Sequence, residues 1–217
     1  MLTLPLLRKM LNRAGTELKA NSKYLCELDS VAGDGDHGIT IGRMADVMKE
    51  KTEDTTIDTM RVLLDELGDA FMGINGGSAG PLWGTVFTGM AEGIDDQAEL
   101  TDLELRKMFT QAKEDFMDIS KAKPGDKTMV DALYPAIDAI IETQGSLKEI
   151  MTAAAAAADA GAEQTSTMVA RFGRAKNMGE RSIGTKDPGA VSIAILFNGM
   201  APVSYTHLRA HETRSNL

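Results

Sequence analysis

The sequence of 217 residues is poor in several residue types, and each shortage excludes a class of protein. A single cysteine, Cys26, rules out a disulfide framework and a cysteine-rich zinc site. The 23 Lys and Arg residues against 32 Asp and Glu, a net charge of −9, argue against a general binder of nucleic-acid backbones. No apolar run approaches the roughly 20 residues that span a bilayer, and charges from Arg8 to Lys19 interrupt any signal-peptide pattern in residues 1–20. We therefore expect a cytoplasmic protein that binds neither nucleic acid nor membranes.

The residues that are abundant favour helices. Aromatic residues make up only 5%, β-branched runs are scarce, and Met and Ala are frequent. An apolar face repeats every three or four residues between Leu4 and Leu18, and no window alternates like a strand. Residues 191–197 are ambiguous, but they follow the Asp187-Pro188 start signal and are assigned to a helix. The prediction is an all-α fold of about eight helices, with helices after the first over residues 38–50, 57–71, 80–93, 102–119, 129–142, 146–171 and 188–200.

The end of the sequence differs from the rest. Residues 202–217 show no helical period, and their polar side chains do not continue the preceding pattern. We interpret residues 201–217 as a non-native or disordered tail, and leave His207 and His211 out of the functional argument. Residues 1–200 then form one domain, as the length predicts.

The segment from Leu28 to Gly38 carries three carboxylates, Asp29, Asp34 and Asp36, on a glycine-rich backbone. Its glycines match the dinucleotide-binding pattern, but no strand precedes them, and the aspartates would repel a pyrophosphate. An EF-hand loop fails because its twelfth position is Ala45 rather than Glu. Crowded carboxylates with all-oxygen ligands favour magnesium or manganese. Exposed turn and helix-cap residues are an equally good interpretation of this spacing alone.

Two further glycine-rich loops complete a pattern. Residues 73–84 would leave backbone N–H groups bare at a helix start, where phosphate oxygens bind, although a flexible connector fits as well. Residues 173–189 carry four basic side chains and form either a solvated loop or an anion-binding lid. Residues 123–129 resemble the end of a Walker A loop, but Asp126 separates the glycine from Lys127, so we interpret them as a turn. A metal loop, a bare helix start and a basic loop together favour metal-assisted phosphoryl transfer.

These motifs occur in the order found in one known family. They are Gly-Asp-Gly-Asp-His-Gly at 33–38, Gly-Gly-Ser-Ala-Gly-Pro-Leu at 76–82, Gly-Asp-Lys-Thr-Met at 125–129, Gly-Arg-Ala at 173–175, Gly-Glu-Arg-Ser-Ile-Gly at 179–184 and Asp-Pro-Gly-Ala at 187–190. From about residue 2 to residue 200, the chain resembles the nucleotide-binding L subunit of dihydroxyacetone kinase, the DhaL or DAK2 family.

The resemblance implies an eight-helix antiparallel barrel with the nucleotide site in the loops at one end. It implies that Asp29, Asp34 and Asp36 hold two magnesium ions bridging the phosphates of ADP or ATP, and that Arg174 acts beside them. Ile39 and Thr40 stand where the common pattern often has Met and Asn, and Ser120 replaces a usual Gly. The implied nucleotide contacts are His37, Gly38, Ile39, Thr40, Ser78, Ala79, Ser120, Met129, Arg174, Asp187, Pro188 and Gly189.

The resemblance also implies partners. Dihydroxyacetone or a related ketose would be held by a separate DhaK-like K subunit, and bound ADP would be rephosphorylated by a DhaM-like protein of the phosphotransferase system. The short chain and His37 favour this donor. Two alternatives stay open: an ATP-dependent ketose kinase subunit with exchangeable nucleotide, and a regulatory module that transfers nothing. The identity of the ketose and the oligomeric state, a homodimer included, are also open.

Overall fold

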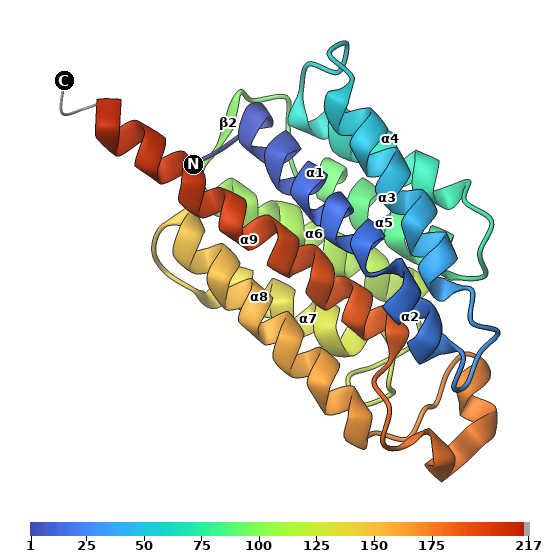
Figure 1. The fold of residues 1–217 in the computed structure, drawn as a ribbon. Coiled ribbons are helices and arrows are strands. Elements are labelled where there is room, and N and C mark those ends of the chain that lie inside the picture. The colour runs from blue at the N-terminus through green and yellow to red at the C-terminus, as the bar shows by residue number, and fades with distance from the viewer. Residues whose placement is uncertain (215–217) are drawn as a thin grey trace.

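The computed structural model describes the backbone of residues 1–214 and the side chains of residues 1–201, so the side chains of His207 and His211 lie outside the described part. Helices dominate this part of the chain, which confirms the all-α prediction (Figure 1). The elements are β1 (Leu2–Thr3), α1 (Leu4–Ala20), α2 (Ser22–Asp29), α3 (His37–Glu53), α4 (Met60–Met72), α5 (Ala79–Glu92), β2 (Glu99–Leu100), α6 (Asp102–Ile119), α7 (Val130–Glu142), α8 (Leu147–Gln164), the 3-10 helices η1 (Thr165–Thr167) and η2 (Arg174–Ser182), and α9 (Pro188–Arg214).

Eight of these helices close into a barrel. From α3 to α8, every helix packs against the helix that follows it in the chain. Helix α9 then packs against α1, and α1 contacts α3, which closes the ring. The short helix α2 extends α1 at one end of the barrel (Figure 1). This closed ring is the eight-helix barrel that the resemblance implies.

The loops divide between the two ends of the barrel. The connections α2–α3, α4–α5, α6–α7 and α8–α9 lie at the end where α2 sits (Figure 1). Each of the motifs described above lies in one of these connections or runs from it into the following helix. The opposite end holds the connections α3–α4, α5–α6 and α7–α8 and the small antiparallel pairing of β1 with β2, Leu2 opposite Leu100. We call the end with α2 the loop end.

Local sequence signals start the helices at the opposite end. The side chains of Thr3 and Thr59 cap α1 and α4. Full capping boxes pair Thr101 with Glu104 in α6, and Ser146 with Glu149 in α8. Since a side-chain oxygen satisfies an otherwise unpaired N–H group of the first turn, such caps fix where a helix begins. The predicted start at Asp102 is confirmed.

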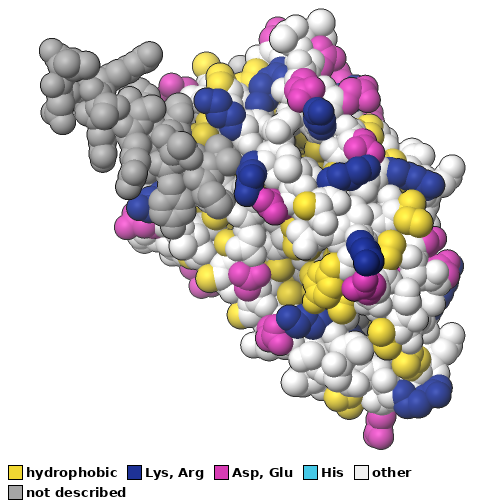
Figure 2. Space-filling view, in the orientation of Figure 1, with side chains coloured by type: hydrophobic (Ala, Val, Ile, Leu, Met, Phe, Trp, Pro, Cys, Tyr) yellow, Lys and Arg dark blue, Asp and Glu magenta, His cyan; other side chains and the backbone are white. Residues whose placement is uncertain are grey.

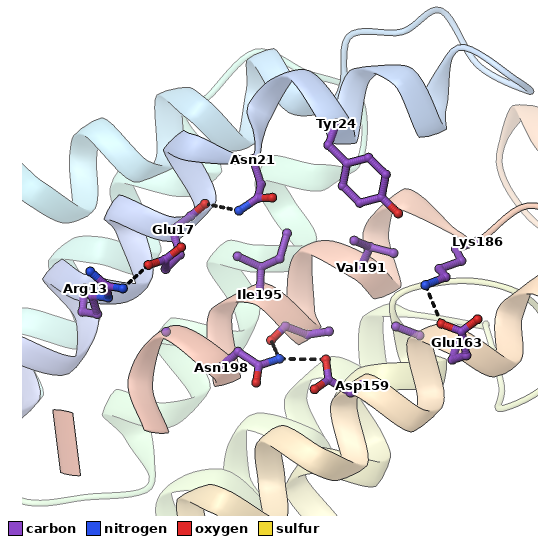
Figure 3. A pocket seen from close by; sticks show the side chains of 13 residues that line it. Arg13, Glu17, Asn21, Tyr24, Asp159, Glu163, Lys186, Val191, Ile195 and Asn198 are labelled. Carbon is purple, nitrogen blue, oxygen red and sulfur yellow. Dashed lines mark hydrogen bonds and ion pairs between the residues drawn. The ribbon is translucent and has the colours of Figure 1, made fainter. Parts of the chain in front are cut away.

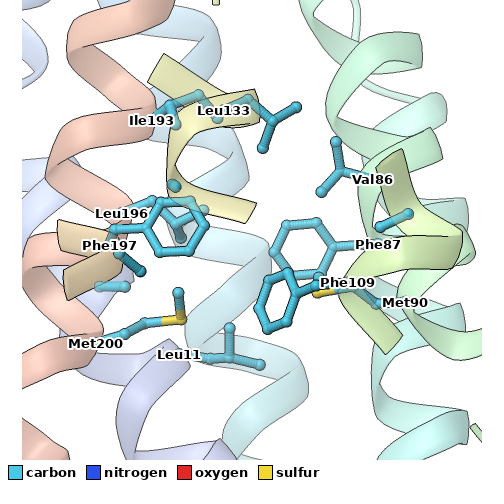
Figure 4. Packing of buried hydrophobic residues seen from close by; sticks show 14 of the residues in the cluster. Leu11, Val86, Phe87, Met90, Phe109, Leu133, Ile193, Leu196, Phe197 and Met200 are labelled. Carbon is cyan, nitrogen blue, oxygen red and sulfur yellow. The ribbon is translucent and has the colours of Figure 1, made fainter. Parts of the chain in front are cut away.

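The interior of the barrel is apolar. Large side chains from opposite walls meet there, among them Phe87 of α5, Phe109 of α6 and Phe197 of α9, with Leu11 of α1 below them (Figure 4). All four are at most 5% exposed. Because this core is continuous, burial of apolar surface stabilises the ring as one unit.

The structure differs from the prediction in α2 (Ser22–Asp29), which the sequence patterns did not predict, and most clearly at the ends of two predicted helices. The predicted helix over 146–171 ends at Gln164, because Thr165, Ser166 and Thr167 each donate a side-chain hydrogen bond to the carbonyl three residues earlier. The helix predicted to end at residue 200 continues as α9 to Arg214, although the sequence beyond it lacks a helical period. The ambiguous residues 191–197 lie in α9, which confirms their assignment.

Among the described residues, no helix is both long enough and apolar enough to cross a membrane. On the face in Figure 2, which α1, α8 and α9 form, acidic and basic side chains alternate around an exposed apolar area.

Candidate functional site

The three aspartates of the acidic loop lie together at the loop end. Asp29 ends α2, Asp36 precedes α3, and Asp34 lies on the loop between them. One carboxylate oxygen of each lies within 4.8 Å of the others. Asp29 Oδ2 accepts hydrogen bonds from the backbone N–H groups of Asp36 (3.1 Å) and His37 (3.4 Å), which fold the loop back on α2. Three converging carboxylates with accessible oxygens are suited to hold magnesium.

Arg174, which is far from these aspartates in the sequence, contacts the cluster. It begins η2, and its guanidinium forms an ion pair with the carboxylate of Asp34. The hydrogen bond from Arg174 holds the pKa of Asp34 below its usual value, and the same contact raises the pKa of Arg174. Both side chains are more than two-fifths exposed, so water screens this pair strongly. The basic loop therefore lies over the acidic loop.

Three of the eight barrel helices begin at the loop end without a cap from the N-cap side chain. The side chains of the N-cap residues Asp36 of α3, Ser78 of α5 and Met129 of α7 accept no hydrogen bond from the first turn. Other side chains accept from one N–H group each in α3 (His37 to Asp29) and in α7 (Val130 to Thr128 Oγ1, 3.3 Å). Helices α1, α4, α6 and α8, which begin at the opposite end, are all capped by Ser or Thr. Uncapped first turns present N–H groups and the positive end of the helix dipole to a ligand. The loop end is thus built to accept anionic oxygens.

Two adjoining clefts open at the loop end. The polar cleft, with a volume of about 280 Å³, contains the three aspartates, Gly76, Gly77 and Arg174. The apolar cleft, about 470 Å³, is lined by aromatic and aliphatic side chains, among them Trp83, Phe116, Ile119 and Phe172. Both clefts share the residues His37, Ser78, Ala79, Lys127, Phe172, Gly173, Asp187 and Pro188. An elongated ligand with an anionic end and a flat apolar end fits this division.

The wall between the clefts holds His37 and Asp187. A ring nitrogen of His37, Nε2, lies 3.2 Å from Ser192 Oγ, and that hydroxyl donates to the carbonyl of Gly189. Burial lowers the pKa of His37, against the charge of Asp29. Asp187 Oδ2 accepts from the N–H of Ala190 at 2.7 Å and so caps α9, as its place before Pro188 predicts. Burial raises the pKa of Asp187 to about 7.

The structure brings most of the predicted contact residues to these clefts. Ser78, Ala79, Ser120, Met129, Pro188 and Gly189 line the apolar cleft, beside His37 and Asp187. Gly38, Ile39 and Thr40 do not line either cleft. Ile39 is 54% exposed, and Thr40 is buried beneath Gly76, where a Cβ on Gly76 would meet its side chain. The structure therefore does not bring these three predicted contacts to the clefts.

Sequence reasoning missed Lys127. Its side chain is buried, lines both clefts and donates hydrogen bonds to carbonyl groups of the basic loop. The signal that could have found it is its position between Gly125 and Met129, in a motif that matches the family. In the sequence, Lys127 is tested only as the phosphate-binding lysine of a Walker A loop, and it is set aside because that pattern fails.

A third groove of about 410 Å³ lies on the outer wall, between α1, α8 and α9 (Figure 3). Its charged side chains already have partners within the groove. Lys186 pairs with Glu163, Arg13 pairs with Glu17, and Asp159 accepts a hydrogen bond from the side-chain amide of Asn198 at 2.7 Å. Because these groups are already paired, the groove offers less to an ionic ligand than the loop end does.

Comparison with known proteins agrees with this geometry. The family model described as "DAK2 domain" matches residues 31–202. The ADP-binding subunit DhaL of the PEP-dependent dihydroxyacetone kinase of Escherichia coli is 35% identical over 194 residues, which is 88% of this chain and 92% of that protein. The L-erythrulose kinase of Pectobacterium atrosepticum is 35% identical over 94% of this chain, which spans only 36% of that enzyme.

Solved structures show the same relationship. The dihydroxyacetone kinase of C. freundii in its native form superposes with a TM-score of 0.74 at 25% identity. The superposed region is 91% of this chain and 34% of the C. freundii chain. Its complex with AMP-PNP and Mg²⁺ gives a TM-score of 0.69 at 27% identity. Since the family model spans most of the chain, and the bacterial relative matches over nearly its whole length, the chain belongs to the DAK2 domain family.

Proposed function

We propose that this chain is the nucleotide-binding subunit of a dihydroxyacetone kinase. It holds ADP or ATP with magnesium at the loop end of the barrel, and passes a phosphoryl group to dihydroxyacetone or a related ketose on a separate DhaK-like subunit. The names of the relatives support the reaction class, since they include ADP-binding DhaL subunits and erythrulose kinases.

One observation carries the proposal: the acidic cluster, the uncapped helix starts and the apolar cleft lie side by side at one end of the barrel. A nucleotide needs these three environments in this order, for the metal-bound phosphates, for their free oxygens and for the base. Mixed charge scattered over a surface would not place an apolar cleft directly beside three converging carboxylates.

Each group then has a chemical role. Asp29, Asp34 and Asp36 would hold two magnesium ions, which would neutralise the charge of the phosphates. Arg174 pairs with Asp34 in this structure, and its guanidinium would be free to pair with phosphate oxygens if that carboxylate held a metal. The uncapped N–H groups of α5 would take further oxygens. The apolar side chains around Trp83 would exclude water from the base.

The side chains around the mouth of the site are suited to contact a protein partner. Several large apolar side chains stay exposed on the loops and helix ends there, between 38% and 54% of their surface: Val31, Ile39, Ile119, Phe172 and Ile183. Exposed apolar side chains gathered around a cleft are typical of a docking surface. A DhaK-like subunit that covers this rim would bring its ketose to the phosphoryl donor.

For the phosphoryl donor we propose the phosphotransferase system, acting through a DhaM-like protein on ADP that stays bound. The full-length relatives support it, since their names read "PEP-dependent" and "PTS-dependent". The second candidate is an ATP-dependent ketose kinase with exchangeable nucleotide, and the erythrulose kinases, of which this chain matches about a third, give it weaker support.

The test is to denature freshly purified protein to which no nucleotide has been added, and to identify any released nucleotide by chromatography. Near-stoichiometric ADP is expected if the nucleotide is a bound cofactor. Empty protein that binds Mg-ATP reversibly would favour the ATP-dependent kinase. Empty protein that does not respond to Mg-ATP would overturn both and leave a regulatory module. Addition of a DhaK-like subunit loaded with dihydroxyacetone then tests transfer itself.

A further inference from the structure

Lys127 is the most constrained charged residue near the site. It is 4% exposed, and its backbone has a φ of 59°, the only positive φ at a non-glycine residue in the described part of the chain. A residue with a Cβ adopts this left-handed conformation only where its surroundings require it. The position of the lysine side chain is therefore specified by the fold.

The ammonium of Lys127 makes three hydrogen bonds to backbone. Nζ donates to the carbonyls of Ser182 (2.5 Å), Thr185 (2.6 Å) and Met168 (3.4 Å). A lysine has three N–H donors in a tetrahedral arrangement, so these carbonyls account for all of them. Burial lowers the pKa of Lys127, and the nearby charge of Asp187 opposes that shift.

The three carbonyls lie on both sides of Arg174. Met168 lies before Arg174, and Ser182 and Thr185 lie after it within the basic loop, so one side chain joins the two segments that flank Arg174, which we call the feet of the loop. Two more bonds tie the feet together: Ala170 N–H to Ser182 Oγ at 2.9 Å, and Gly184 N–H to the Ser166 carbonyl at 2.7 Å.

Between these feet few contacts surround the glycines of the loop. Gly173 and Gly179 both have positive φ, and a Cβ at either of them would meet no atom within 4 Å. Arg174 itself is 63% exposed in its side chain and is held at its tip by the ion pair with Asp34. Without fixed feet, such a segment would not keep the guanidinium over the acidic loop.

We propose that Lys127 is a positioning residue, which clamps both feet of the basic loop so that Arg174 faces the acidic cluster. Its importance for nucleotide binding rests on the proposed function, whereas the clamp does not. Arginine would not replace it, because a planar guanidinium cannot direct donors to three carbonyls as an ammonium does.

Hydrogen–deuterium exchange tests the clamp directly. In Lys127→Met, amides of residues 168–185 are expected to exchange at least about tenfold faster than in wild type, while those of the barrel helices are unchanged. Lys123→Met is the matched control, because Lys123 is an exposed lysine of the same loop. If Lys127→Met does not fold, Lys127→Arg carries the same test, since it retains the charge. Wild-type exchange in this loop for the folded variant would overturn the proposal.

A double-mutant cycle tests whether the clamp acts through Arg174. Mg-ADP affinity is measured for wild type, Lys127→Met, Arg174→Ala and the double variant. Each single change is expected to weaken Mg-ADP binding by about tenfold or more. The affinity of the double variant should be no lower than that of the single variant with the lower affinity. Effects that multiply would overturn the positioning role, since a purely structural lysine would act independently of Arg174. If wild type binds no Mg-ADP, the proposed function fails, and the exchange measurement still decides the clamp.

Discussion

The close packing of α3 on α2 predicts a sharp difference between two glycines of the same helix. A Cβ added to Gly38 would overlap the backbone carbonyl oxygen of Ser22, and would lie 2.8 Å from Cys26 Sγ. A Cβ added to Gly42, one turn later, would lie 3.1 Å from Ser22 Oγ and 3.7 Å from Lys19 Nζ. The first obstacle is backbone that cannot move alone, whereas the second consists of side-chain ends that can rotate.

The expected magnitudes follow from these contacts. Replacing glycine by alanine inside a helix stabilises it by up to about 1 kcal/mol, and this gain should appear in Gly42→Ala. In Gly38→Ala, overpacking costs about 1–3 kcal/mol and pushes the start of α3 away from α2. The hydrogen bonds from Asp36 and His37 N–H to Asp29 would lengthen, and the three carboxylates would separate. A displacement near 1 Å of groups around a reacting centre can cost about a hundredfold in reaction rate.

Urea unfolding and Mg-ADP titration of the two variants check this prediction. Gly42→Ala should unfold at the same or higher urea concentration than wild type and bind normally. Gly38→Ala should unfold earlier and lose most of its affinity for Mg-ADP. Equal stability and equal affinity in the two variants would show that the contact between α2 and α3 does not set the geometry of the acidic loop.

Three further outcomes are expected. Asp34→Ala removes one of three converging carboxylates and the partner of Arg174, so it should abolish nucleotide retention while circular dichroism shows unchanged helical content. Asp187 has a pKa raised from 3.8 to about 7, so the folded state binds its proton more tightly than the unfolded state, and its ionisation destabilises the fold as pH rises from about 4 to about 7. Asp187→Asn, which can still cap α9, should therefore gain stability relative to wild type over that range, by up to about 4 kcal/mol in urea unfolding at pH 8, and an equal difference at pH 4 and pH 8 would contradict it. Thr101→Ala removes a cap at the opposite end and should cost about 1 kcal/mol of unfolding free energy with no change in Mg-ADP affinity.

The sequence by itself determined the helical class, most helix positions and the composition of the acidic loop. Capping boxes such as Thr101 with Glu104, and apolar repeats of three or four residues, act over a single turn, so they can be recognised without knowing the fold. The five- and two-residue steps from Asp29 to Asp34 and Asp36 likewise keep these carboxylates near one another in any compact loop. Local signals failed at Gln164, where three consecutive hydroxyl side chains end the helix earlier than the apolar pattern suggests.

Only the tertiary structure decided what surrounds that loop. Arg174 reaches Asp34, and Lys127 reaches the carbonyls of Ser182 and Thr185, across long stretches of chain. No local pattern encodes such contacts, because they exist only once eight helices have closed into a ring and brought alternate loops to one end. The apolar cleft beside the acidic cluster, with Trp83 and Phe172 from distant segments, arises from the same closure. The sequence therefore specifies the chemical groups, and the closed barrel specifies which of them meet.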